Sequence, residues 1–524
     1  MKYPIGIQSY ESLRRDGYVY VDKTALIYQL VTQGSYYFLS RPRRFGKSLL
    51  ISTLQAYFEG KRELFEGLAI AALEKEWTAR PVLHLDMNTE KYADPESLNS
   101  ILNRNLLRWE ELYGTGPGED TFAGRFEGIV ARAAQKTGHR VAILVDEYDK
   151  PLLQTFDKPE LQEDYRNTLK AFYSVCKTQD RYIKLAFFTG VTKFFAGQSG
   201  IAERSKVSVF SDLNNLKDIS MDMRFVNLCG ITDGELHGCF DEPVEQLAAA
   251  CGITKEECYA KLRLQYDGYH FHEKAEGLYN PFSLLNTLDR LEFRNYWFET
   301  GTPTFLVEVL KKNHYQLDNL TEELATADDL TGLDTAMENP VPLIYQSGYL
   351  TIKGYDKRFR MYKLGYPNKE VEEGFAHFLM PFYTPVSREK QNFFIPNFVR
   401  DLEQGNVEGF MTRLQALFAD GSYQVVGDME LYFQNCMAVI MKLLGFYVDV
   451  ERHTSNGRID IVVKTQDYIY VMELKLDDTV EAALRQIEEK GYALPYAADS
   501  RTLYKIGISF STKTRRLEDW RAVR

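Results

Sequence analysis

The 524-residue sequence has few cysteines and none of them are closely paired. The six cysteines are scattered, without a C-x-x-C pair, so we expect neither a zinc site nor a disulfide framework and interpret them as reduced, mostly structural thiols. No uninterrupted apolar stretch reaches the roughly 18 residues of a membrane helix. The first residues also lack the basic and apolar segments of a signal peptide. We therefore expect a cytoplasmic protein that makes no membrane contact.

The sequence also lacks the excess of positive charge that is typical of nucleic-acid-binding proteins. Its formal net charge is −11, from 63 Lys and Arg against 74 Asp and Glu. Residues 425–524 hold 14 basic and 15 acidic residues, a net charge of −1, so most of the acidic excess lies upstream. The sequence therefore leaves open the alternative of a local basic groove in this last segment. The aromatic share of 13% is high, and we attribute it to core packing more than to base stacking.

One stretch, residues 41–48, has the features of a phosphate-binding loop. An apolar run, residues 36–39, precedes it, and a helical pattern, residues 49–58, follows it, which predicts a strand, a loop and a helix. In such a loop backbone N–H groups surround phosphates, the lysine reaches the β and γ oxygens, and the serine helps to hold Mg²⁺. The expected ATP-binding residues are Arg43, Arg44, Phe45, Gly46, Lys47 and Ser48.

The loop departs from the Walker A pattern G-x-x-x-x-G-K-[ST] at its first position, where Arg41 stands in place of glycine. A side chain at this turn can alter how closely the backbone approaches the nucleotide, so the departure bears on ATP hydrolysis more than on ATP binding. The alternative interpretation is a basic surface loop before an ordinary helix.

A second signal is the apolar run of residues 141–145, which ends in Asp146 and Glu147. Such a run is typical of a parallel strand buried on both faces, and ligands bind at the carboxyl ends of these strands. Together with the loop, the pattern predicts a Walker B strand in which Asp146 orders Mg²⁺ and Glu147 polarises the attacking water.

A third predicted strand, residues 182–188, is followed by polar residues. Thr189 is our candidate for a sensor that contacts the γ-phosphate or the attacking water, and Thr192 is the second candidate. A simple Thr-Gly turn is the alternative. Arg224 could also reach a nucleotide, but the sequence does not fix its geometry.

In the middle of the chain, helical patterns after Gly301 lead into two further runs, residues 343–352 and 358–364. Helices followed by a β-hairpin predict a small winged-helix-like module. Winged helices can bind DNA, but we favour a packing and interdomain role here. Residues 368–418 are expected to form a helical connector with breaks at Pro381, Pro385 and Pro396.

The last hundred residues carry two acids and a lysine on predicted strands. Asp460 lies on one strand, and Glu473 and Lys475 share one face of the next because side chains alternate along a strand. Two carboxylates beside a cation form an oxygen-ligand site that suits Mg²⁺, with Mn²⁺ as an alternative. The metal would neutralise charge on a phosphodiester, while Lys475 would position or deprotonate the attacking water.

Two further residues complete this candidate set. Glu430, on a preceding helix, would hold the metal through water, and Gln486, on the helix 480–490, would orient the substrate or Lys475. The alternative is a salt-bridged surface hairpin, which the Glu-x-Lys pair alone would favour.

Residues 1 to about 365 resemble the predicted AAA-ATPase-like family of bacteria. The matching stretches are Phe38–Ser48, Leu144–Asp149, Phe210–Ile219, Tyr266–Tyr269 and Asn295–Pro303. The resemblance implies a P-loop ATPase domain of the AAA or STAND type. It also implies that an arginine at the position of Arg41 is typical of the family. It assigns no role to Phe210–Ile219 or Tyr266–Tyr269, where Asn, Asp and Gly are more typical of turns.

The ordered set of acids, lysine and glutamine in the last segment resembles the PD-(D/E)XK nuclease superfamily, in the form fused behind the AAA-ATPase-like domain. All matching positions are present: Glu430, Asp460, Glu473, Lys475 and Gln486. The resemblance spans about residues 425–510 and implies a metal-dependent nuclease whose partner is nucleic acid, with DNA favoured over RNA.

The sequence thus predicts an α/β protein of several domains. The expected parts are a parallel-sheet P-loop domain (1–220), a helical lid-like region (221–300), a winged-helix-like module (301–367), a helical connector (368–424) and a PD-(D/E)XK nuclease-like α/β domain (425–524). The expected function is ATP-regulated, metal-dependent cleavage of nucleic acid. The alternative is a nucleotide-binding regulatory or signalling protein whose last domain binds nucleic acid or another partner without cutting. Assembly into a homo-oligomer stays open.

Overall fold

The computed structural model divides the chain into two compact units. Unit 1 contains residues 1–313 and 321–371, and unit 2 contains residues 314–320 and 372–524. The structure describes residues 1–193, 209–298, 306–307, 309–310, 315, 317, 323–331, 339–383, 391–421, 429–445, 447–455 and 458–524. Within these ranges it describes the backbone alone for residues 391–394, 420–421, 429–431, 452–455 and 458–460.

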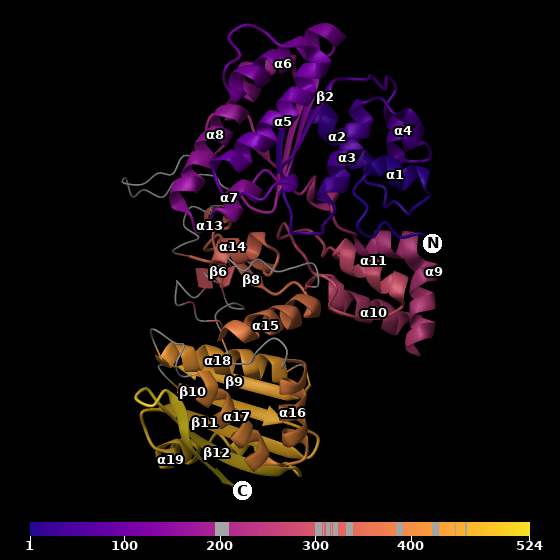
Figure 1. Cartoon of the computed structure of the whole chain (residues 1–524). Coiled ribbons are helices and arrows are strands. Elements are labelled where there is room, and N and C mark those ends of the chain that lie inside the picture. Colours follow the sequence, from indigo (N-terminus) through magenta and orange to yellow (C-terminus); the bar gives the residue numbers. More distant parts are fainter. Residues whose placement is uncertain are drawn as a thin grey trace. The chain divides into compact units, whose positions relative to one another are not determined.

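A five-stranded parallel sheet forms the centre of the N-terminal part of unit 1 (Figure 1). The strand order is β2-β3-β4-β1-β5, so β4 separates the strand before the loop from the strand that ends in Asp146. All six residues of β3 are buried, as its unbroken apolar run predicts. The strands are β1 (Tyr36–Ser40), β2 (Val82–Asp86), β3 (Val141–Asp146), β4 (Ile183–Gly190) and β5 (Lys217–Asp218).

Helices lie on both sides of this sheet (Figure 1). Some of them begin at a residue whose side chain caps the helix: Asp94 and Thr121, for example, accept hydrogen bonds from the first turns of α5 and α6. On one side of the sheet are α5 (Pro95–Tyr113), α6 (Phe122–Thr137) and α8 (Pro159–Thr178), and on the other are α1 (Tyr10–Arg15), α2 (Thr24–Gln33), α3 (Lys47–Phe58) and α4 (Ala69–Leu73).

The rest of unit 1 is mainly helical and ends in a small antiparallel sheet of order β6-β8-β7. Its helices are α7 (Lys150–Gln154), α9 (Asp233–Cys251), α10 (Lys255–Tyr266), α11 (Pro281–Arg290), α13 (Ala327–Thr331) and α14 (Val341–Gln346), and its strands are β6 (Leu324–Ala325), β7 (Thr351–Asp356) and β8 (Met361–Gly365). A hairpin follows helices here, as expected from the sequence. The run that begins at Leu343, however, starts as the buried helix α14, because a short apolar run fits a buried helix as well as a strand.

Unit 2 places helices beside a mixed five-stranded sheet of order β13-β12-β11-β10-β9. Only β11 and β12 pair in parallel, and the helix α19 connects them. The elements are α15 (Lys369–Tyr383), which begins in unit 1, α16 (Gln391–Glu403), α17 (Val407–Gly421), α18 (Met429–Leu444), β9 (Asp449–Ser455), β10 (Arg458–Lys464), β11 (Tyr468–Leu476), α19 (Val480–Lys490), β12 (Thr502–Ser511) and β13 (Arg516–Val523).

Three details of unit 2 differ from the sequence expectation. Pro381 and Pro396 lie inside α15 and α16 and do not break them, because packing of the flanking apolar residues outweighs the lost backbone hydrogen bond. Pro385 lies outside the described residues. The strand expected from Phe446 begins only at Asp449. The final strand, β13, was not predicted, since its sequence alternates charged and apolar residues only weakly.

In the part of the chain that the structure describes, no helix combines the length and apolar character needed to cross a bilayer.

Candidate functional site

The predicted phosphate-binding loop connects β1 to α3 at the carboxyl edge of the parallel sheet. Its last residue, Gly46, caps α3 with a φ of +96°, in a region that side chains disfavour, which explains the glycine at this position. Lys47 is the first residue of the helix and is only 4% exposed. Its Nζ donates to the carbonyls of Arg41 and Pro42 at 3.1 and 3.3 Å. The lysine therefore folds back over its own loop.

A pocket of about 810 Å³ lies beside this loop, within the size range of small-molecule sites. Six of the predicted residues line the pocket: Arg43, Arg44, Gly46, Lys47, Ser48 and Glu147. Phe45 does not, because its ring packs against Tyr269 and Phe271. Arg224 is exposed and pairs with Asp222, and it is not among the lining residues either.

The acidic end of β3 lies directly against the next strand. Asp146 is 4% exposed, and its Oδ1 accepts hydrogen bonds from the Thr189 hydroxyl at 2.6 Å and from the Glu147 amide at 3.0 Å. Thr189, fully buried on β4, thus contacts the carboxylate predicted to order the metal. Neither side chain is among the residues that line the pocket. The structure therefore brings the sensor candidate and the Walker B candidate together. The predicted contact of Thr189 with the γ-phosphate or the attacking water stays a prediction.

Glu147 adopts a left-handed backbone conformation, with a φ of +51°. This conformation costs a non-glycine residue about 1 kcal/mol. Its Oε1 lies 3.3 Å from Lys47 Nζ, so the predicted catalytic acid forms an ion pair with the predicted phosphate-binding lysine. The strained turn places the carboxylate in the pocket beside the loop.

Asp149 is a structural residue of this site that we did not select from the sequence. It is fully buried, and its Oδ2 accepts hydrogen bonds from the Val191 amide, the Thr192 amide and the Thr192 hydroxyl. Burial, together with the nearby Glu147, raises the pKa of this carboxyl to about 6. Thr192, our second sensor candidate, therefore bonds to Asp149 and helps to fix the chain after β4.

The pocket also has an aromatic wall that the sequence analysis did not identify. Trp297, Phe298 and Tyr349 line it, together with Phe282 of α11 and the N-terminal segment Pro4–Gln8. Trp297 Nε1 donates to the carbonyl of Arg43 at 3.1 Å, which ties the wall to the loop. The stretch Asn295–Pro303 was the available signal, but no chemistry could be read from its residues.

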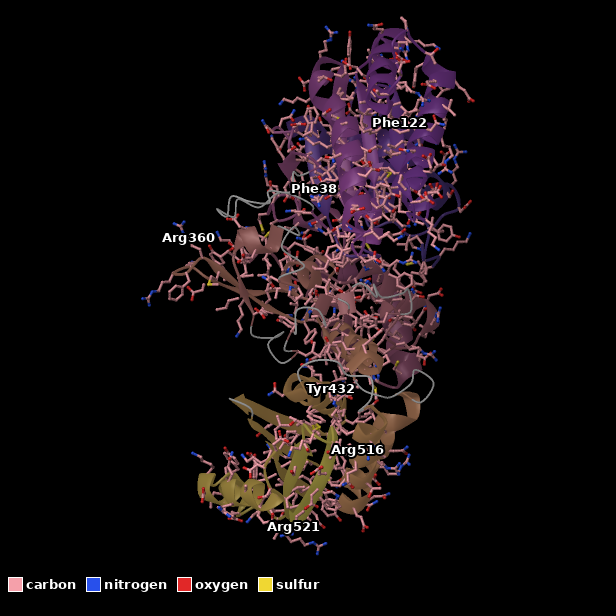
Figure 2. All side chains as sticks on the ribbon, turned by 60° about the vertical axis from the view of Figure 1, so that its left-hand side comes forward. Phe38, Phe122, Arg360, Tyr432, Arg516 and Arg521 are labelled. Atoms are coloured by element: carbon pink, nitrogen blue, oxygen red, sulfur yellow. The ribbon has the colours of Figure 1, made fainter. Side chains whose placement is uncertain are left out.

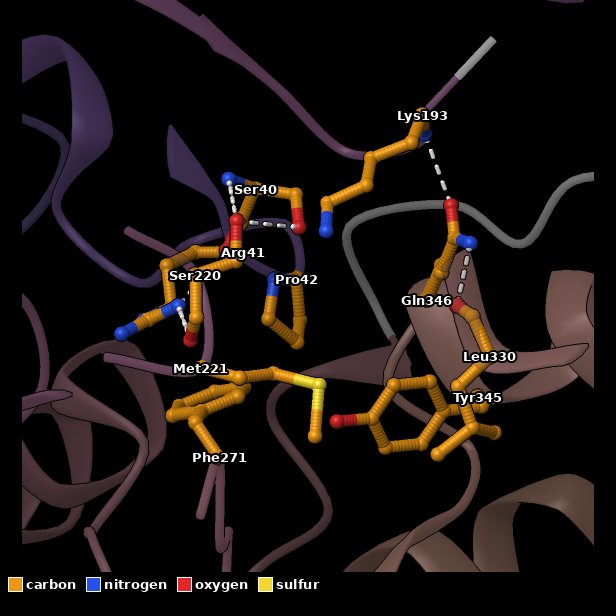
Figure 3. Close-up of a pocket in the computed structure, with 10 residues that line it drawn as sticks. All are labelled: Ser40, Arg41, Pro42, Lys193, Ser220, Met221, Phe271, Leu330, Tyr345 and Gln346. Carbon is orange, nitrogen blue, oxygen red and sulfur yellow. Dashed lines mark hydrogen bonds between the residues drawn. The ribbon is translucent and has the colours of Figure 1, made fainter. Parts of the chain in front are cut away.

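Arg41 is not among the residues that line the pocket beside the loop. Its guanidinium is buried and donates to the carbonyls of Ser40, Ser220 and Val226, and it stacks 3.9 Å from the ring centre of Phe271 (Figure 3). Burial lowers its pKa to about 10, so it stays charged at neutral pH. The cavity that Arg41 lines holds only about 20 Å³, room for roughly one water molecule. The arginine in place of glycine thus anchors the loop from behind and does not obstruct the pocket.

In unit 2, Lys475 connects two of the other predicted residues. Its Nζ lies 2.6 Å from Glu473 Oε1 and 2.5 Å from Gln486 Oε1. Glu473 is fully buried on β11, and Gln486 reaches the pair from α19. The expectation that Glu473 and Lys475 share one face of the strand is therefore confirmed.

The helix α19 reaches this site because it packs closely on the sheet. Gly507 on β12 is the register partner of Glu473. A Cβ atom at this position would lie 2.6 Å from the carbonyl oxygen of Val480, at the start of α19. Any side chain there would push the helix outward, and Gln486 would move away from Lys475.

The second predicted metal ligand lies on the adjacent strand. The β10–β11 ladder pairs Asp460 with Glu473, which brings the backbones of the two acids side by side. The side chains of Asp460 and Glu430 lie outside the described part, although Glu430 does belong to α18. Among the described residues no three His, Cys, Asp or Glu side chains form a metal-binding group.

Glu473, fully buried on β11, offers carboxylate oxygen, the kind of ligand that a hard divalent cation prefers. Gln486 Nε2 is buried and has no hydrogen-bond partner among the described residues, so its two N–H donors are available for oxygens of a water or a phosphate.

The anchoring role of Arg41 makes a prediction that opposes the sequence pattern. Restoring the pattern with Arg41→Gly should destabilise unit 1 by about 3 kcal/mol or more, because two buried carbonyls and one partly buried carbonyl lose a charged donor and a cavity forms. It should also weaken ATP binding. Denaturant unfolding and equilibrium ATP binding would measure both effects, with Arg43→Gly, an exposed arginine of the same loop, as the stability control. A variant that is as stable as the wild type and binds ATP more tightly would contradict the anchor.

Comparisons with known proteins agree with this two-part arrangement. A family model described as "Predicted AAA-ATPase" matches residues 4–199, and one described as "PD-(D/E)XK nuclease superfamily" matches residues 428–520. The chain is 36% identical over 531 residues to an uncharacterized protein in the vnfD 5′ region of Azotobacter chroococcum mcd 1, and the match covers 98% of this chain and 97% of that protein. No solved structure matches the chain. The chain belongs to the family of predicted AAA-ATPases that carry a PD-(D/E)XK nuclease superfamily domain at the C-terminus.

Proposed function

We propose that this protein binds ATP in the unit 1 pocket and uses it to regulate cleavage of nucleic-acid phosphodiesters, with DNA favoured, by the C-terminal domain. The observation that carries the proposal is the position of Lys475 Nζ between Glu473 and Gln486, one strand away from Asp460. A salt bridge that only stabilised the surface would not require a fully buried carboxylate or an inward-facing glutamine.

The cleavage site would work through four residues. Glu473 and Asp460 would hold Mg²⁺ or Mn²⁺, which supplies charge neutralisation at the phosphodiester when bound. Lys475 would position the attacking water as an ammonium group or deprotonate it as a neutral amine, and its bonds to Glu473 and Gln486 fix its Nζ for this task. Glu430 would complete the set from α18, as the order of the residues implies.

The nucleotide site would work by exchanging partners of Lys47. Its ammonium now bonds to two loop carbonyls and lies beside Glu147. Phosphate oxygens would attract the ammonium more strongly than neutral carbonyls do. Glu147 would then be released to polarise the attacking water, while Ser48 and Asp146 hold Mg²⁺ and Thr189 keeps the Asp146 carboxylate in place.

The direct test of cleavage uses the purified full-length protein with single-stranded DNA, duplex DNA and RNA in Mg²⁺ or Mn²⁺. We expect cutting that EDTA abolishes and that Glu473→Gln and Lys475→Ala each lower by about 10² to 10⁴-fold. Lys505→Ala, which removes an exposed pair with Glu488 in the same unit, serves as the matched control and should cut normally. If none of the three substrates is cut in the presence of metal, the nuclease proposal is wrong. The regulatory alternative, in which the last domain binds without cutting, would then be favoured.

The partner exchange predicts a specific phenotype for Glu147→Gln. ATP binding should persist, because Lys47 loses only a competing partner. ATP hydrolysis should fall by about 10² to 10⁴-fold, since the group that polarises the water is lost. Equilibrium binding and phosphate release would measure the two quantities separately. Hydrolysis at the wild-type rate would show that Glu147 does not activate the water.

A further inference from the structure

The tip of the β7–β8 hairpin in unit 1 has no assigned role. Figure 2 shows Arg360 at the outer end of this hairpin, which projects from the rest of the unit. The four turn residues Lys357, Arg358, Phe359 and Arg360 are all exposed, and the Phe359 ring is 62% exposed. A single exposed apolar residue is common on protein surfaces, but this ring stands among three exposed cations, Lys357, Arg358 and Arg360.

The hairpin concentrates positive charge in an acidic protein. Residues 353–363 contain five basic residues and one acidic residue, a net charge of +4, whereas the whole chain carries −11. No ion pair joins Lys357, Arg358, Arg360 or Lys363 to a carboxylate of the described residues. The one acid, Asp356, accepts the backbone N–H groups of Arg358 and Phe359 at 2.8 and 3.1 Å and so serves the turn itself. The cations at the tip are therefore available to an external anion.

The backbone conformation of Arg360 at the tip is unfavourable for any residue with a side chain. Arg360 has a φ of +55°, where glycine or asparagine would be easier by about 1 kcal/mol. Neither the hydrogen bonds of the turn nor the packing of the sheet needs its side chain. A strained conformation with a long cation at an exposed position points to a contact outside the chain.

The hairpin presents these side chains from a turn with a defined backbone. Asp356 closes the turn, and the cross-strand pair Tyr355 and Tyr362, with ring centres 4.8 Å apart, supports the two strands. The guanidinium carbon of Arg358 lies 5.1 Å from the ring centre of Phe359, so a cation and an aromatic face stand side by side. Because the backbone of the turn is already ordered, binding would cost side-chain entropy but little backbone entropy.

We propose that this hairpin tip binds nucleic acid. Lys357, Arg358 and Arg360 would contact backbone phosphates, and the Phe359 ring would lie against the bases or sugars beside them. The tip places an aromatic ring between two guanidinium groups. Nucleic acid, in which phosphates lie beside flat, apolar base faces, fits this arrangement better than a carboxylate-rich protein surface does. A single phenylalanine offers too little apolar area to bind a membrane. The inference rests on the proposed function for the identity of the polymer, but it does not require that the protein cuts.

The test measures binding of the full-length protein to a fluorescent DNA duplex and to the corresponding single strand, in EDTA so that no cleavage occurs. Arg358→Glu with Arg360→Glu should weaken binding by about tenfold or more at low salt, and it should reduce the slope of log affinity against log salt by about 2. Phe359→Ala should weaken single-strand binding by about fivefold or more. The control, Lys91→Glu with Lys177→Glu, makes the same change of charge at two exposed lysines elsewhere in unit 1 and should bind like the wild type.

Three outcomes would overturn the inference: hairpin charge reversal that binds as well as the control, wild-type protein that binds neither strand form, or hairpin-dependent binding to polyglutamate but not to DNA. Cleavage in Mg²⁺ is measured separately, so the two proposals can fail independently. Hairpin-dependent binding without any cutting would support the tip and reject the nuclease. Cleavage together with DNA binding that the hairpin substitutions do not change would support the nuclease and reject the proposed role of the tip.

Discussion

The hydrogen-bond ladder that places β4 between β1 and β3 is the constraint on which the proposed nucleotide site depends. It brings Thr189 of β4 against Asp146 of β3, and it continues from Gly190 to the amide of Arg41, where the loop begins. Loop, acid and sensor candidate therefore share one edge of the sheet. From behind, the Arg41 side chain fixes the loop to the carbonyls of Ser220 and Val226, so a loop without its first glycine still has a defined shape.

In unit 2 a mixed sheet likewise brings candidate residues from different elements together. Two acids on adjacent strands meet in register, and the close packing of α19 at Gly507 delivers Gln486 to Lys475. Both sites share one feature: a lysine is held against a carboxylate, Lys47 with Glu147 and Lys475 with Glu473. In each case the binding of phosphate or metal would compete for one member of the pair, and this competition would make both proposed sites responsive to their ligands.

The parts that depend on local pattern were predictable from the sequence, and those that depend on distant contacts were not. The buried run of β3 and the shared face of Glu473 and Lys475 follow from side-chain periodicity. The direction of Arg41 depends on carbonyls about 180 residues away, and the role of Asp149 depends on amides after the next strand. No periodicity encodes such contacts. The helix α14 was misplaced because its apolar run fits either structure.

The central claim is that ATP regulates the nuclease, and a ligand can do this only if it binds two forms of the protein with different affinity. The most direct measurement is the single-turnover cleavage rate with and without ATP, in the wild type and in Lys47→Ala. The account predicts that ATP changes the wild-type rate by about 5- to 150-fold, the usual range of coupling between two sites. Lys47→Ala should cut at one rate in both conditions. A wild-type cleavage rate that ATP does not change, or a Lys47→Ala variant that responds to ATP as the wild type does, would contradict the claim that ATP regulates the nuclease.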